Sequence, residues 1–87
     1  MDATDIRRED CRFAVLRALD ARASGAHDAE TLRSVYMRNH DFTQAEVLDA
    51  LALMQTAELV RSVDRGAPSF GFGWQITLEG SKAYARR

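Results

Sequence analysis

The chain has 87 residues, the size of a single domain spanning 1–87, and 46% of them are hydrophobic, so a modest core can form without a metal ion or a disulfide. Twelve basic and thirteen acidic side chains nearly cancel, so the overall charge favours neither nucleic acid nor an anionic membrane as a partner. One cysteine excludes an internal disulfide, and the lack of a long apolar run or signal-peptide pattern predicts a cytoplasmic protein with no membrane span.

Residues 5–24 are predicted to form the first helix, because apolar side chains recur there at helical spacing and Gly25 supplies a stop signal. The apolar stripe consists of Cys11, Phe13, Val15, Leu16, Ala18 and Leu19. It is wider than one small core requires, so we expect Cys11 and Val15 to contribute to contact with a second subunit. The expected assembly is a homodimer, since two-fold pairing is the commonest closed arrangement.

Arginines line the same helix: Arg7, Arg8, Arg12, Arg17 and Arg22. Several have acidic side chains within one helical turn. Pairing inside the helix is therefore expected to account for much of this row.

Residues 28–39 are predicted to form a short second helix, with Asp28 as its N-cap. Leu32, Val35 and Tyr36 recur at helical spacing and are expected to point inward. A turn at residues 39–41 then leads into the next helix.

The stretch 42–60 contains the third predicted helix and carries no lysine or arginine. Thr43 can cap it while Glu46 reaches back to complete a capping box, and Phe42 with Val47 can form a hydrophobic staple. The expected inward face consists of Val47, Leu48, Leu51 and Met54.

Two strands and a last helix are predicted for the remainder of the chain. Residues 60–64 and 70–76 alternate in the manner of strands, with turn-forming residues between them. The second strand places aromatic and aliphatic side chains on one face, a pattern more typical of core than of a base-stacking platform: Phe70, Phe72, Trp74 and Ile76. Thr77 then caps a helix over residues 78–84. The predicted class is mainly α with a small β-hairpin.

Two segments resemble winged helix-turn-helix domains, which consist of three helices, a two-stranded wing and, here, a short C-terminal helix. "LALMQTAELVRSV" is similar to the end of a recognition helix entering the wing, with Leu51, Met54, Leu59 and Val60 in the apolar positions. "WQITLEGSKAYA" is similar to the second wing strand entering the final helix, with Trp74, Ile76, Thr77 and Gly80 matching.

The opening segment "DIRREDCRFAVLRAL" resembles the start of small winged-helix proteins of Mu-like phages and prophages. The resemblance implies a small DNA-associated regulator of phage or bacterial type. In DNA-binding members, the outer face of the third helix enters the major groove and meets phosphates through lysine and arginine.

This chain departs from that pattern at two places. Glu58 stands where the family usually has glycine in a left-handed conformation, so the third helix is expected to end differently. The outer face of that helix is expected to present Ala45, Glu46, Asp49, Ala52 and Leu53, with Gln44 near the tip. Carboxylates there would repel phosphates, although they could read cytosine amino groups; a solvated face is the more common arrangement.

Two functions therefore remain open. Contacts to duplex DNA would come from Gln44, Arg61, Arg65, Lys82 and Arg86. Alternatively, a protein partner would contact Ala45, Ala52 and Leu53, together with the helix-one positions Cys11 and Val15.

Catalysis is not expected from this sequence. It contains no phosphate-binding glycine loop and no nucleophile motif. His27, His40 and Cys11 lie too far apart in sequence to form a recognisable metal site, so no metal or cofactor is predicted.

Overall fold

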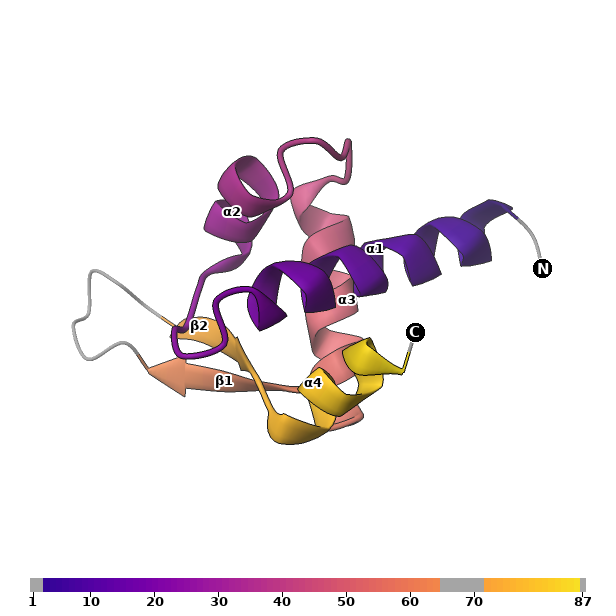
Figure 1. Ribbon diagram of the computed structural model, residues 1–87. Coiled ribbons are helices and arrows are strands. Elements are labelled where there is room, and N and C mark those ends of the chain that lie inside the picture. The colour runs from indigo at the N-terminus through magenta and orange to yellow at the C-terminus, as the bar shows by residue number, and fades with distance from the viewer. Residues whose placement is uncertain (1–2, 65–71, 87) are drawn as a thin grey trace.

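The computed structural model describes residues 3–64 and 72–86 (Figure 1). In chain order the elements are α1 (Ala3–Asp20), α2 (Ala29–Thr31), η1 (Leu32–Tyr36), α3 (Gln44–Thr56), β1 (Val60–Asp64), β2 (Phe72–Ile76) and α4 (Leu78–Ala85). The mainly helical class with a two-stranded antiparallel sheet is confirmed for the described residues.

Helix α1 is the longest element and lies across α3, with its first turns extending beyond the body of the domain (Figure 1). It ends at Asp20, four positions before the predicted boundary, and turns follow it. Its buried side chains are Cys11, Ala14, Val15, Leu16, Ala18 and Leu19. The wide apolar stripe is therefore used by the domain's own core, against α3, α4 and β2.

The predicted second helix is a single α turn that continues as a π turn. The Asp28 cap is confirmed, because its Oδ1 accepts a hydrogen bond from the Thr31 amide at 3.0 Å. The amide of Met37 donates to the Leu32 carbonyl at 2.7 Å, the wider spacing of a π turn. That extra residue rotates the positions after Leu32, so the prediction that Val35 points inward is wrong: its side chain is 53% exposed.

The start of α3 is confirmed in detail. Thr43 Oγ1 accepts from the Glu46 amide at 3.1 Å, and Glu46 Oε1 accepts from the Thr43 amide at 2.9 Å, which closes the capping box. The buried face consists of Val47, Ala50, Leu51 and Met54. Leu48 was expected in this face but is 40% exposed, because it lies at the edge of the stripe.

The end of α3 differs from the prediction. Glu58 adopts a left-handed φ of 64°, the conformation that the glycine of the related pattern would take. The Leu59 amide bonds the Met54 carbonyl at 2.8 Å, and the Glu58 amide bonds the Gln55 carbonyl at 3.0 Å. The helix therefore ends in a glycine-type cap in spite of its glutamate.

The hairpin follows α3 directly. Strands β1 and β2 pair with Val60 opposite Ile76 and Ser62 opposite Trp74. Ile76 is buried and Trp74 packs against the core, as predicted for this face of the second strand, and Val60 of β1 is buried opposite Ile76; Phe70 lies outside the described residues. His27 forms an isolated antiparallel bridge with Trp74 of β2. The His27 nitrogen is 2.9 Å from the Trp74 carbonyl oxygen, and the Trp74 nitrogen is 2.7 Å from the His27 carbonyl oxygen.

Helix α4 returns the chain to α1. Thr77 caps it, accepting from the Gly80 amide at 3.0 Å, as predicted. Tyr84 stacks on Phe13 of α1 with ring centroids 5.5 Å apart. Gly80 is buried where α4 passes the carbonyl of Leu59. The Thr77 amide donates to the same carbonyl at 3.0 Å, which joins the start of α4 to the end of α3.

Candidate functional site

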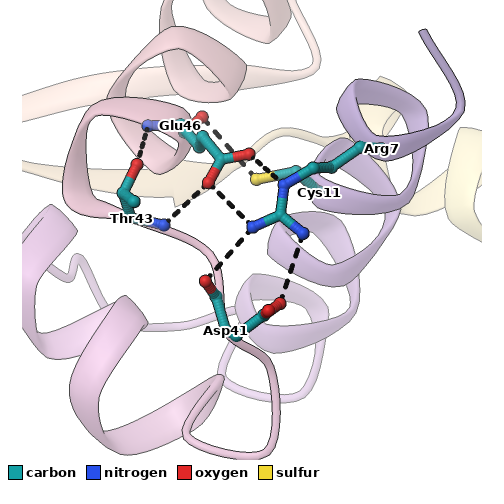
Figure 2. Close-up of polar contacts among 5 residues, drawn as sticks. All are labelled: Arg7, Cys11, Asp41, Thr43 and Glu46. Carbon is teal, nitrogen blue, oxygen red and sulfur yellow. Dashed lines mark hydrogen bonds and ion pairs between the residues drawn. The ribbon is translucent and has the colours of Figure 1, made fainter. Parts of the chain in front are cut away.

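The junction of α1 and α3 is held by a cluster of charged side chains centred on Arg7 (Figure 2). Its guanidinium donates through Nε and Nη2 to the two carboxylate oxygens of Glu46, at 2.5 and 3.0 Å. It also reaches Asp41, with Nη1 3.3 Å from Oδ1 and Nη2 3.2 Å from the backbone carbonyl. The same guanidinium lies over the Phe42 ring, 5.0 Å from its centroid. Arg7 therefore joins α1 to the loop and first turn of α3.

The cluster joins one guanidinium to two carboxylates. The Arg7 guanidinium and the Thr43 amide hold the pKa of Glu46 at about 2, so the carboxylate stays ionised at neutral pH. The carboxylates in turn raise the pKa of Arg7. Glu46 is half-buried against α1, which corrects the expectation that it lies on the outer face of the third helix. The arginines of α1 were expected to pair within their own helix. For Arg7 this expectation is wrong, because its partners come from other elements.

Cys11 of α1 lies beside Arg7 and Glu46 (Figure 2). Its thiol contacts the Glu46 carbonyl oxygen at 3.6 Å, and burial raises its pKa to about 11. A thiol that stays protonated at neutral pH is a poor nucleophile. Cys11 is 2% exposed and Val15 is 0% exposed, so neither presents side-chain surface to a partner. The prediction that these two residues contact a second subunit is corrected, because the domain's own core covers them.

The outer face of α3 is exposed and carries no cation. Its exposed side chains include Gln44, Ala45, Leu48, Asp49, Ala52 and Leu53. The two leucines are 40% and 53% exposed. The sequence projection placed all of these outward except Leu48. This face offers apolar contact and one carboxylate, and it offers no positive charge to a phosphate.

In the described part of the hairpin, the cation Arg61 has its side chain held by hydrogen bonds. Arg61 of β1 is exposed, and its Nη2 and Nε donate to Gln75 Oε1 at 2.6 and 3.2 Å. Gln75 Nε2 in turn donates to the Ala23 carbonyl at 2.9 Å. The remaining guanidinium N–H groups of Arg61 stay available to solvent or a ligand. Arg65 lies outside the described residues.

The other predicted DNA contacts lie on α4 and at the far end of α3. Lys82 is 3.6 Å from Glu79 in an exposed ion pair, and Arg86 is exposed at the C-cap. Gln44 is the first residue of α3, whereas Arg61 follows its end. Thirteen helical residues span about 20 Å, so the structure does not bring Gln44 and Arg61 together.

A groove of about 440 Å³ lies between α1 and α3 beside the Arg7 cluster. Arg8 and Arg12 line it from α1, and Asp49 and Leu53 line it from α3. Cys11 and Ala50 also line it and are largely buried, at 2% and 5% exposed. Sequence reasoning did not identify this groove. The four-residue spacings of Arg8 with Arg12 and of Asp49 with Leu53 place each pair on one ridge, but the sequence did not indicate that the ridges face a common space.

Within residues 3–64 and 72–86, no group of three or more His, Cys, Asp and Glu side chains is placed to hold a metal ion. No helix in that part of the chain combines the length and the apolar character needed to cross a membrane. The chain matches no protein-family model, no curated protein and no solved structure.

Proposed function

We propose that this chain is a winged helix-turn-helix domain that holds duplex DNA by its phosphates, without reading bases through α3. The proposed function is non-catalytic and is that of a small phage or bacterial regulator. The observation that carries the proposal is the distribution of charge around α3. Its exposed face carries no cation, whereas exposed cations follow it on β1 and α4.

The order of the elements supports the winged-helix interpretation. The hairpin follows α3 through a tight cap, and α4 then packs back on α1. Arg61 is the best-placed cation, because Gln75 fixes its side chain and leaves N–H donors free.

Phosphate contacts without base contacts predict a defined binding behaviour. Affinity should be almost independent of sequence, and it should fall steeply as salt increases, because each neutralised phosphate releases counterions. The logarithm of affinity falls with the logarithm of salt concentration by about 0.9 for each contacted phosphate. Removing one contacting cation should therefore reduce this slope by about one.

Fluorescence anisotropy with two unrelated duplexes tests the proposal. The variants Arg61→Ala and Lys82→Ala should weaken binding to both duplexes and lower the salt slope. Arg17→Ala, which removes an equal charge from the exposed side of α1, is the matched control and should leave the slope unchanged. Gln44→Ala should have little effect. A failure to bind either duplex at low salt would refute DNA binding, and loss of one defined site in Gln44→Ala would show base reading by α3.

A second candidate function is binding of another protein through the outer face of α3. The exposed side chains of Leu48 and Leu53, 40% and 53% exposed, favour it. Leu48→Ser would then reduce partner binding and leave any affinity for duplex DNA unchanged. An absence of duplex binding together with loss of partner capture in Leu48→Ser would favour this candidate.

A further inference from the structure

The groove between α1 and α3 holds charges that the fold itself leaves unpaired. Arg7 and Glu46 also line the groove and form an ion pair with each other. Arg8 and Arg12 on the α1 wall make no hydrogen bond or ion pair with another described residue, and neither does Asp49 on the α3 wall. The groove therefore has one basic wall and one acidic wall.

The same groove also exposes apolar surface. Leu53 lies one turn beyond Asp49 on the same ridge of α3 and is 53% exposed. A ligand that fills the groove must therefore supply an apolar side chain and charges of both signs.

We infer that the occupant is a second copy of this chain, related to the first by a two-fold axis. A two-fold contact requires a surface that is complementary to itself. Here the Asp49–Leu53 ridge of one copy supplies a carboxylate for Arg8 and Arg12 of the other, and the symmetric contact repeats the pairing. The Leu53 side chains of the two copies pack against each other between these ion pairs and are removed from solvent.

The charges of the groove disfavour a nucleic acid as its occupant. A phosphate near Arg8 and Arg12 would also approach Asp49 on the facing wall, and Leu53 offers it no hydrogen bond. The inference does not rest on the proposed DNA contacts, because Arg61 and Lys82 lie on other elements. It does account for an α3 that is acidic and apolar: that face meets a second copy.

Sedimentation velocity of the full chain over a concentration series tests the inference. The wild-type protein should shift from monomer to dimer as concentration rises. Leu53→Glu should sediment as a monomer, while Leu78→Glu should behave like the wild type. Leu78 is the matched control, because it is an exposed leucine on α4, 70% exposed, that does not line the groove.

Charge reversal separates ion pairing from a general loss of folding. Asp49→Arg should sediment as a monomer because it faces Arg8 and Arg12, and the double variant Arg8→Glu with Arg12→Glu should do the same. Combining all three substitutions should restore the dimer. A wild-type protein that stays monomeric at every concentration would overturn the inference. So would a dimer unaffected by Leu53→Glu and Asp49→Arg, or a triple variant that stays monomeric.

Discussion

Arg7 of α1 and Glu46 of α3 form a two-point ion pair across 39 positions of sequence. Glu46 uses the same carboxylate to close the capping box of α3 with Thr43. One side chain thus fixes where α3 begins and how α1 lies against it. Because the pair is partly exposed, we expect it to specify geometry and pH dependence more than to supply a large stabilisation.

Acid should weaken the fold through Glu46. Its folded-state pKa of about 2 lies below the ordinary value of 4.5, so its contribution is present above pH 4.5 and is lost as the pH falls toward 2. Urea unfolding monitored by Trp74 fluorescence should show this loss over that range. Arg7→Met keeps an apolar chain over Phe42 but removes the charge, and its stability should depend less on pH there. If the free energy of unfolding depends equally on pH in both proteins, the Arg7–Glu46 pair does not cause the acid sensitivity.

Removal of the Thr43 hydroxyl should destabilise the domain by about 1 kcal/mol, because the amide of Glu46 would lose its acceptor at the start of α3. Thr56→Ala is the matched control at the other end of the same helix. Its hydroxyl bonds only the Ala52 carbonyl at 3.1 Å, within the helix. Chemical unfolding should separate the two variants. Equal losses would indicate that the capping box contributes nothing specific.

Glycine should be better than glutamate at position 58. The φ of 64° is unfavourable for a residue with a side chain, so Glu58→Gly should stabilise the protein by about 1 kcal/mol. Ala57→Gly is the control, because Ala57 has an ordinary φ of −83° and glycine there only adds freedom to the unfolded chain. The melting temperature should rise for the first variant and not for the second. A fall in both would mean that the Glu58 side chain makes a favourable contact.

Local signals in the sequence predicted the starts of the helices well. Asp28, Thr43 and Thr77 were each identified as caps, and each accepts the expected backbone hydrogen bond. These predictions succeed because a cap depends on residues three positions apart. The bounds of β1 were also predicted correctly, since turn chemistry and alternation are local as well.

Features that depart from a regular helix, or that depend on distant residues, were not predicted. A regular projection cannot anticipate the π turn that places Val35 outward. Glu46 pairs with Arg7 of another helix. A projection of α3 alone does not include that partner, and it therefore places the Glu46 carboxylate on the outer face. The groove arises from the way two helices cross, and neither ridge indicates it alone. Gln44 and Arg61 were grouped by residue type, and the length of α3 separates them.

Gly80 should tolerate an added side chain much less well than Gly25. A Cβ atom there would lie 2.1 Å from the Leu59 carbonyl oxygen and 2.7 Å from Ile76 Cγ1. The first contact is with backbone that caps α3, so α4 would have to move away from the hairpin and from α1. Gly80→Ala should therefore cost about 3 kcal/mol, at the upper end of overpacking effects.

Gly25→Ala provides the comparison. Its added Cβ would lie 3.2 Å from the His27 side chain and 3.8 Å from the Arg22 carbonyl oxygen, so the ring need shift by only a few tenths of an ångström. Calorimetry of the two variants should show a large loss of melting temperature for Gly80→Ala and a small change for Gly25→Ala. A Gly80→Ala protein as stable as the wild type would require that α4 pack farther from Leu59 than it does here. The Phe13–Tyr84 stacking between α1 and α4, at 5.5 Å, would then have to loosen as well.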